Sequence, residues 1–572
     1  MTVKIAIFKA IQSALKQSDI YTDFTVDQGQ TTHYQCSVIL KQKLPKDAKL
    51  ALAQSICNML IEEDFIENAY ASGPGFINID VTDYELSRSL ESLTSSPTCG
   101  IHNKETGLVY LDYGGANIAK DLHIGHIRSA VIGDTLKNIY ETIGYRVSVY
   151  PHFGDFGLHI GHTISQMKRD GVRVKITTNH RLTLKDVDHK TVTDFSSYYR
   201  RGSKSAKDNP EHMTESRDVL LSLQNNSCRE NKGFFNALCY LSKEAIRYQY
   251  GLLGVHFSNN SGEYAALDSI GHIVASLSNR AMLEKSDGAE VIRTSHDDPV
   301  ILKNSYGCYG YAATDLCELL NRVTRMKNDI LGKDHSEIVY LADDRQKHHF
   351  DQVFEVADKI LDLSDIEVKH IGFGTINGTD GKPFKTRSGD TVLLEDVFNQ
   401  IEQRIKENYP DVNDADAKRI VCSCIRYSEL MCSRSKSYVF DMDVMTSTQG
   451  QTGPYILYTY LRFEKLIHTA LEKTNGTAGP ISILTDVERD IALVMSNYSD
   501  VINLCARTYK PHHLAHHAYA LCAAMNRFYG QISLLHESDR ERLNSLVSLC
   551  LSALKQLQST VDILGLTVPK KM

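Results

Sequence analysis

A strand that turns directly into a long helix is the feature that most limits how this chain can fold. Residues 108–113 (LVYLDY) are β-branched and aromatic and lie between Gly107 and Gly114, as in a buried strand. After a short turn, apolar residues recur at helical spacing from Ile127 to Ile143. A strand, a helix and then the strand-like residues 146–153 (RVSVYPHF) follow one another, and this alternation is typical of a parallel sheet. The pattern predicts an α/β domain that begins near residue 106.

The remaining sequence predicts a multidomain α/β protein, because 572 residues are too many for one core. Residues 1–100 alternate helical and strand patterns, as in a small α/β domain, and residues 106–395 form the sheet-bearing domain. The polar, helical stretch at about 165–260 is predicted to be an insertion between two halves of the sheet. Strand patterns resume after it at AEVIRT, VILKNS and EIVYLA. Residues 396–450 are predicted to be a helical connector and residues 451–572 an all-helical domain.

Composition excludes several classes of protein. Apolar residues make up 42% and charged residues 23%, which is ordinary for a soluble globular chain, and no apolar run approaches the roughly 18 residues of a membrane span. Lys9, Gln12 and Ser13 interrupt the apolar N-terminus, so we expect a cytoplasmic start rather than a secretory signal. The thirteen cysteines include no CxxC pair, which favours reduced thiols and no metal site. The net charge of −7 does not favour nucleic acid, although binding depends on local patches.

The turn before the first long helix carries the sequence HIGH at 123–126. A helix N-terminus presents unpaired N–H groups and a partial positive charge, so it favours phosphate. Gly125 has no Cβ and lets a ligand approach the backbone closely, and the rings of His123 and His126 can donate hydrogen bonds to a phosphoryl oxygen. Lys120 can add another cation. Two histidines that merely cap the helix are the alternative.

Two further segments carry charged residues that could bind a ligand. In the loop DGKPFKTRSG at 380–389, Lys385 and Arg387 can close over a polyphosphate, or can equally belong to a solvated basic loop. Tyr311 and Asp315 are four residues apart and share one face if a helix begins there. A carboxylate on such a face suits a guanidinium, which donates paired hydrogen bonds, while a helix N-cap is the simpler interpretation of Asp315.

Together and in this order, these segments resemble the arginyl-tRNA synthetases of class I. The segments that carry the resemblance extend over nearly the whole chain: GPGFINI at 73–79, DYGGANIAKDLHIGHIRSAVIGD at 112–134, HFGDFGLHIG at 152–161, SGEY at 261–264, YAATD at 311–315, RQKHHFDQVF at 345–354, GKPFKTRSG at 381–389, TGPYILY at 452–458, AMNRFY at 524–529 and LGLTVPKKM at 564–572. The resemblance implies a class I Rossmann-type parallel-sheet catalytic domain with an insertion, a small N-terminal α/β domain that contacts tRNA, and an all-α C-terminal anticodon-binding domain.

The resemblance also implies roles for individual residues. For ATP and catalysis it indicates the HIGH turn and the basic loop, namely His123, Gly125, His126, Lys120, Lys385 and Arg387. For the α-amino group of arginine it indicates Asn117 and Gln346, and for the guanidinium Glu263, Tyr311 and Asp315. For the anticodon loop it indicates four helical residues, although residues in such an apolar pattern more often belong to the core: Tyr455, Tyr458, Asn526 and Tyr529.

The implied reaction has two steps. The carboxylate of L-arginine attacks the α-phosphate of ATP, which enters with Mg²⁺, and a terminal hydroxyl of tRNA(Arg) then attacks the adenylate. The chain is expected to work as a monomer in the cytoplasm, away from membranes.

Two alternatives remain open from the sequence. One is a paralogue with a specialised or non-catalytic role in binding tRNA or arginine, and the other is an HxGH adenylyltransferase that acts on a small molecule. Three positions near the expected site depart from the usual family residues: Phe156 stands for tryptophan, His159 for glutamine and Ala116 for proline.

Overall fold

The computed structural model describes residues 3–18, 20–29, 32–101, 107–172, 189–259, 262–329, 335–378, 381 and 392–572. The chain forms two compact units, one made of residues 1–103 with 447–572 and the other of residues 104–446. Among the described helices, none is long and apolar enough to cross a membrane.

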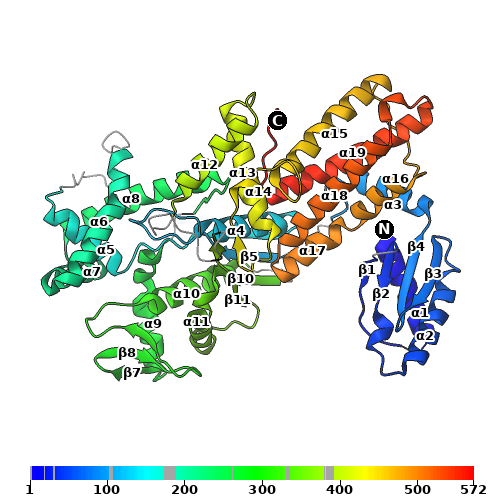
Figure 1. The fold of residues 1–572 in the computed structure, drawn as a ribbon. Coiled ribbons are helices and arrows are strands. Elements are labelled where there is room, and N and C mark those ends of the chain that lie inside the picture. Colours follow the sequence, from blue (N-terminus) through cyan, green and yellow to red (C-terminus); the bar gives the residue numbers. More distant parts are fainter. Residues whose placement is uncertain are drawn as a thin grey trace. The chain divides into compact units, whose positions relative to one another are not determined.

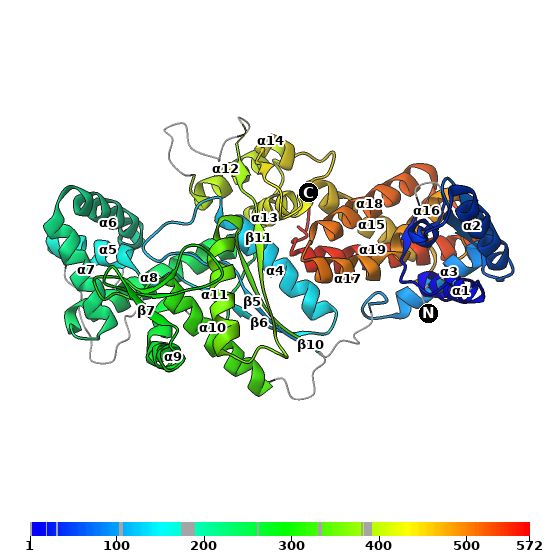
Figure 2. The ribbon, with the colours of Figure 1, turned by 90° about the horizontal axis from the view of Figure 1, so that it is seen from below.

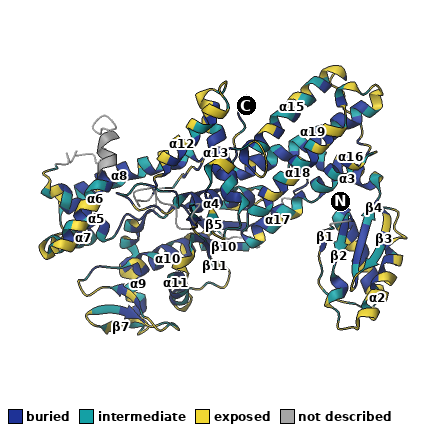
Figure 3. Cartoon of the chain, viewed as in Figure 1, coloured by how far each residue is buried: buried dark blue, intermediate teal, exposed yellow. Residues whose placement is uncertain are grey.

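A four-stranded parallel sheet lies at the centre of the unit formed by residues 104–446 (Figure 1). Its strand order is β11 (Glu367–Phe373), β10 (His335–Asp343), β5 (Gly107–Asp112) and β6 (Arg146–Tyr150), and every neighbouring pair is parallel. β5 is buried over its whole length (Figure 3), as its apolar sequence predicts. β5 and β6 follow each other in one direction, whereas β10 joins on the other side of β5. The carboxyl ends of β5 and β10 therefore flank the point where the strand order reverses, the usual ligand crevice of such sheets.

Helices pack on this sheet. α10 (Tyr311–Asp329) and α11 (Lys347–Ile360) share a buried apolar core with β5 and β10, which includes Leu316, Val353 and Leu108. Figures 1 and 2 show α4 (His126–Thr142) on the other side of the strands from α10 and α11. The parallel-sheet domain predicted from the sequence is thus confirmed.

The insertion does lie between two halves of the sheet, since β5 and β6 precede it and β10 and β11 follow it, but the expectation that every strand pattern after the insertion joins this sheet is wrong. EIVYLA lies in β10, but AEVIRT and VILKNS lie in a separate antiparallel sheet of β7 (Leu283–Ser286), β8 (Ala289–Ile292) and β9 (Val300–Lys303). The cause is the turn between β7 and β8, where Asp287 and Gly288 have φ of 49° and 79°. Positive φ at both central residues is the geometry of a two-residue hairpin turn, so these strands pair locally.

Two buried ion pairs join α4 to α13 (Asp414–Met431). Arg128 Nε lies 2.8 Å from Glu429 Oε1, and Arg426 Nη2 lies 2.7 Å from Asp134 Oδ2. Buried charges must be paired to be tolerated, so these contacts fix the helix that follows the HIGH turn against α13. The other elements of this unit are helical except for two short strands: α5 (Leu158–Arg169), α6 (His189–Asp208), α7 (Pro210–Gln224), α8 (Arg229–Leu252), η3 (Glu263–Ala266), α9 (Leu267–Asn279), η4 (Asp344–Gln346), β12 (Ile376–Asn377), α12 (Leu394–Asn408), β13 (Tyr438–Val439) and α14 (Met442–Met445).

The unit formed by residues 1–103 and 447–572 combines an antiparallel sheet of order β1-β2-β4-β3 with a helical bundle. Contacts between its early and late residues include the double ion pair of Arg489 with Asp83, at 2.8 and 2.7 Å, and the 2.8 Å hydrogen bond between Tyr34 and Ser496. Its elements are α1 (Val3–Gln17), β1 (Val26–Gln28), β2 (Tyr34–Cys36), η1 (Val38–Lys41), α2 (Lys46–Leu60), β3 (Ile66–Ser72), β4 (Phe76–Val81), α3 (Asp83–Ser95), α15 (Gly453–Lys473), α16 (Asp486–Ser496), α17 (Tyr498–Thr508), α18 (His512–Gln531), η5 (Leu534–His536) and α19 (Arg540–Leu564).

Candidate active site

The chain leaves β5 through a loop that the end of β6 holds in place. The Gly154 N–H donates to the Ala116 carbonyl oxygen at 3.0 Å, and the Ile118 N–H donates to the Gly154 oxygen at 3.1 Å. A Cβ on Gly154 would lie 2.2 Å from Oδ1 of Asn117, so any side chain at position 154 would displace the Asn117 side chain. The side chain of Asn117 is thereby presented at the carboxyl edge of the sheet.

Residues 122–126, which we call the histidine turn, fix the orientation of two imidazoles. The Gly125 N–H donates to Nδ1 of His123 at 3.1 Å, and the His123 N–H donates to Nδ1 of His126 at 3.0 Å. Nδ1 of His126 also lies 3.2 Å from the His123 carbonyl oxygen, but that oxygen already accepts the His126 backbone N–H at 2.9 Å. Because each Nδ1 accepts a hydrogen bond, the proton of each neutral ring lies on Nε2.

Both rings are uncharged at neutral pH. Burial lowers the pKa of His126 to about 3, with a further contribution from His123. Burial and then the Lys120 cation lower the pKa of His123. The ring centroids are 4.0 Å apart, so the turn offers two neighbouring Nε2–H donors to one charged group. Neutral donors fixed before the ligand arrives are suited to stabilise charge that develops on an oxygen.

Of the three cations predicted to act at the histidine turn, only Lys120 lies within the described residues. Nζ of Lys120 lies 4.6 Å from the centre of the Tyr199 ring. Lys385 and Arg387 lie outside the described residues. The chain that follows them is anchored to the histidine turn, since the Ile124 N–H donates to the Val392 oxygen at 3.1 Å and the Leu394 N–H donates to the Leu122 oxygen at 3.0 Å.

A second group of side chains, which we call the carboxylate cluster, comprises Glu263, Asp315, His152 and His349. Nε2 of His152 lies 3.3 Å from Oδ1 of Asp315 and 3.9 Å from Oε1 of Glu263. Nε2 of His349 lies 2.6 Å from Oδ2 of Asp315. The cluster thus joins residues from α10, α11, η3 and the end of β6, and it brings together the two carboxylates predicted for the guanidinium.

The cluster carries a defined charge. Burial alone would lower the pKa of His152, but Asp315, Asp112 and Glu263 outweigh it and raise the pKa to about 10. Burial raises the pKa of Glu263 to about 8, against the effect of His152. For Asp315, hydrogen bonds with His152 and His349 outweigh burial and hold the pKa well below its usual range. At pH 7 the free cluster therefore combines the His152 cation, the Asp315 anion and a protonated Glu263.

The remaining residues predicted for arginine are Tyr311 and Gln346, which lie near the carboxyl edge of the parallel sheet. Tyr311 begins α10, and a Cβ on Gly157 would lie 3.3 Å from its hydroxyl. Gln346 is exposed and ends η4, directly after β10. The structure therefore joins Glu263 and Asp315 through His152, whereas it records no contact between Gln346 and Asn117 within the described residues.

Two residues of the carboxylate cluster were missed by the sequence analysis. His152 comes two residues after β6, so the rule that parallel strands end at the same edge contained the signal for it. No periodicity links His349 with Asp315, which is 34 residues earlier, and sequence alone offered no signal for that pair.

The departures from the usual family residues have structural partners. Phe156 is 3% exposed and packs in an apolar cluster with Leu220 and Cys308. Nε2 of His159 lies 3.0 Å from the Gly154 carbonyl oxygen, and burial lowers the pKa of His159 to about 4. Phe156 therefore fills a core position, while the neutral His159 contacts the loop that presents Asn117.

The four residues predicted for the anticodon loop lie on α15 and α18. Nδ2 of Asn526 donates to the Tyr455 hydroxyl at 3.1 Å, and the Arg462 guanidinium lies 3.5 Å from the centre of the Tyr529 ring. Tyr458 is 47% exposed. Tyr458 is thus the aromatic ring of this group with the largest free surface, whereas Tyr455 and Asn526 also hold the two helices together.

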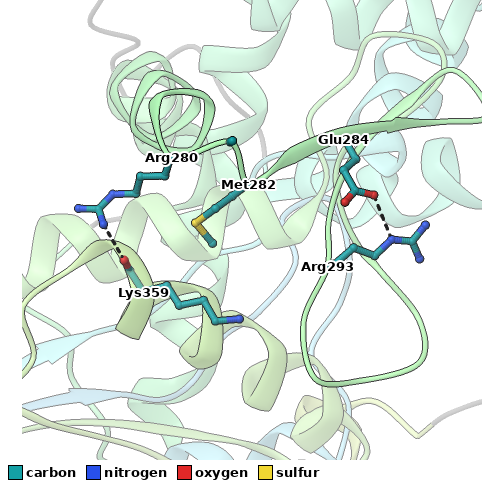
Figure 4. Close-up of a pocket in the computed structure, with 6 residues that line it drawn as sticks. Arg280, Met282, Glu284, Arg293 and Lys359 are labelled. Carbon is teal, nitrogen blue, oxygen red and sulfur yellow. Dashed lines mark hydrogen bonds and ion pairs between the residues drawn. The ribbon is translucent and has the colours of Figure 1, made fainter.

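A separate pocket of about 400 Å³ lies beside the antiparallel sheet of β7, β8 and β9. Figure 4 shows Arg280 donating to the backbone of Lys359 at 3.0 Å and Glu284 paired with Arg293 at 3.2 Å. None of the residues predicted for ATP or arginine lines this pocket.

Comparisons with known proteins agree with this geometry. Residues 90–442 match the family model described as tRNA synthetases class I (R), catalytic domain. Residues 1–81 match the arginyl tRNA synthetase N terminal domain, and residues 456–572 match the DALR anticodon binding domain.

Whole-length relatives agree as well. The arginine–tRNA ligase of Hyphomonas neptunium is 31% identical over 96% of this chain and 95% of its own length, and that of Francisella tularensis subsp. novicida is 29% identical over 99% and 98%. The solved arginyl-tRNA synthetases of Plasmodium falciparum and Thermus thermophilus share the fold, with TM-scores of 0.79 and 0.77, at 22% and 20% identity. The first alignment covers 100% of this chain and 99% of the other, and the second covers 100% of both. The resemblance found in the sequence and the predicted fold class are confirmed, and the chain belongs to the arginyl-tRNA synthetase family of class I.

Proposed function

We propose that the chain ligates L-arginine to tRNA(Arg) at the expense of ATP, through an arginyl-adenylate. The observation that carries this proposal is the pairing of two sites on one sheet edge. The neutral Nε2–H donors of the histidine turn suit a phosphate, and the carboxylate cluster suits a guanidinium. An adenylating enzyme for arginine needs both.

In the first step, His123 and His126 donate to the α-phosphate while the arginine carboxylate attacks it. Gly125 leaves room for ATP, which enters as its magnesium complex. Lys120 lies beside the same turn, and its positive charge contributes to the lowered pKa of both His123 and His126. Lys385 and Arg387 supply the cations for the departing pyrophosphate.

Arginine is recognised at both ends. Asn117 and Gln346 hold the α-amino group, and Glu263, Tyr311 and Asp315 hold the guanidinium. A guanidinium is charged at every physiological pH, so carboxylates must compensate it when it is desolvated. A neutral analogue would leave those carboxylates unpaired, which accounts for selectivity.

The remaining segments serve tRNA. We assign residues 1–100 to the tRNA-contacting domain, 106–395 to catalysis, 396–450 to the connector and 451–572 to the anticodon-binding domain. Tyr455, Tyr458, Asn526 and Tyr529 are the residues proposed to contact the anticodon loop. The proposal treats the chain as a cytoplasmic monomer of 64.2 kDa, a mass that sedimentation equilibrium measures directly.

The first test is ATP–pyrophosphate exchange with tRNA present. The proposal requires exchange that depends on arginine and does not occur with citrulline, its neutral analogue. Exchange that is equally fast with both amino acids would contradict the assignment of the carboxylate cluster.

Replacing Gly125 with alanine is expected to lower kcat about tenfold, because one donor to the phosphate is misplaced. A new Cβ would lie 2.9 Å from Cε1 and 3.0 Å from Nδ1 of His123, so that ring must turn away. Gly271→Ala on α9 is the matched control, since its Cβ would meet nothing within 4 Å. Steady-state arginylation kinetics of both variants check this; equal rates would show that the His123 orientation is unimportant.

Arginine affinity is expected to rise with pH between 6 and 8. The raised pKa of Glu263, about 8, means that the free protein holds a proton there below pH 8, and a guanidinium favours the carboxylate. Binding therefore releases a proton, and the apparent affinity falls about tenfold for each pH unit below 8. His152 remains cationic and Asp315 anionic over this range, and Asp155 is the other charge that acts on Glu263.

Titration calorimetry in two buffers of different ionisation enthalpy measures the released proton. Glu263→Gln is expected to remove the pH dependence along with part of the affinity. Binding without proton release at pH 7 would contradict the protonated state of Glu263.

A further inference from the structure

A single imidazole lies between the two carboxylates of the carboxylate cluster. We infer that His152 is a positioning residue that sets the spacing and net charge of Glu263 and Asp315 for one guanidinium. This inference rests on the proposed function, and it assigns to His152 a part in arginine specificity that does not require contact with ATP or tRNA.

The backbone places His152 where it can act on both carboxylates. Nε2 of His152 lies 3.3 Å from Asp315 and 3.9 Å from Glu263. The Glu263 N–H donates to the carbonyl oxygen of Phe153 at 3.1 Å, so the residue next to His152 in sequence directly anchors Glu263. A change in the position of one residue is therefore transmitted to the other.

Free bonding capacity remains in the cluster. Glu263 is 7% exposed, and its Oε2 has no hydrogen-bond partner among the described residues. A buried oxygen without a partner is costly unless a ligand supplies a donor. The oxygen left over on Glu263 is thus a place for a guanidinium N–H.

The charge of His152 matches the cluster to its ligand. Two carboxylates close together repel, and below about pH 8 the free cluster holds a proton on Glu263 beside the His152 cation and the Asp315 anion. When a guanidinium displaces that proton, the imidazolium balances one of the two carboxylates and the guanidinium balances the other. Glu263 and Asp315 can then both face the ligand as carboxylates.

Replacing His152 with glutamine removes the charge and keeps a polar side chain. For His152→Gln we expect the KM for arginine to rise about 30-fold, the loss typical of breaking a buried charge pair, while the KM for ATP changes less than about twofold. The pH at which arginine affinity reaches its plateau should also move up by about one unit, because Glu263 then holds its proton more tightly. His272→Gln, on the exposed side of α9, is the matched control.

A second variant separates charge from packing. His152→Lys keeps a cation and is expected to retain the wild-type pH plateau, with an arginine KM within about tenfold of wild type. A merely structural role would lower kcat and ATP affinity in both variants and leave the pH plateau in place. An unchanged arginine KM and pH plateau in His152→Gln, or a shifted plateau in His152→Lys, would overturn the inference while the proposed function stands. A wild-type chain that does not charge tRNA with arginine would overturn both.

Discussion

Replacing Asp315 with asparagine is expected to raise the KM for arginine about 100-fold, with the KM for ATP within about twofold of wild type. The substitution removes a carboxylate that is 14% exposed and lies 3.3 Å from His152 and 2.6 Å from His349. Loss of one partner of a buried, hydrogen-bonded charge pair costs about 3 kcal/mol, which corresponds to that factor in affinity. Steady-state arginylation with each substrate varied in turn measures the two KM values.

Asp298→Asn is the control matched to Asp315→Asn. Asp298 is also paired with a histidine, His348 at 2.8 Å, but that pair is exposed, and surface pairs contribute little. The control should leave both KM values unchanged. Equal loss of arginine and ATP affinity in Asp315→Asn would instead make Asp315 a structural residue.

Replacing His126 with alanine is expected to lower kcat by about 100-fold to 1000-fold, the effect typical of losing one preorganised donor to a developing oxyanion. The neutral ring has its Nδ1 occupied by the His123 N–H at 3.0 Å, so Nε2–H is the group lost to the phosphate. The arginine KM should change little, because the carboxylate cluster contains no contact with His126.

The step that fails identifies the role of His126. Adenylate formation, measured as pyrophosphate release in a single turnover, should slow by the full factor. The rate of transfer from preformed arginyl-adenylate to tRNA should stay unchanged. His468→Ala, at an exposed position of α15, is the matched control. Equal slowing of both half-reactions would contradict a role at the α-phosphate.

The part of the fold that depends on local pattern could be predicted from the sequence. The apolar run of β5 and the helical spacing of α4 placed the histidine turn at the carboxyl edge of a parallel sheet. The antiparallel sheet of β7, β8 and β9 could not be predicted, because VILKNS has the same apolar character whichever sheet it joins. The Asp287–Gly288 turn decides that β7 and β8 pair locally.

The candidate site likewise contains residues that local sequence predicts and contacts that depend on how distant segments pack. His123 and His126 lie close together in space because only two residues separate them in the sequence, and a pattern of four residues predicts the pair. The contact of Asp315 with His349 depends on how α10 and α11 pack, which periodicity does not encode. His152 lies between these cases, since its place after β6 was predictable but its charge, set by its neighbours, was not.

Aminoacylation of total tRNA with the twenty amino acids, supplied one at a time, tests the central claim most directly. We predict that the chain charges tRNA with arginine alone, which would make Phe156 and His159 tolerated departures from the family. Absence of charging with any amino acid, while tRNA or arginine still binds, would contradict the proposal and indicate a non-catalytic relative.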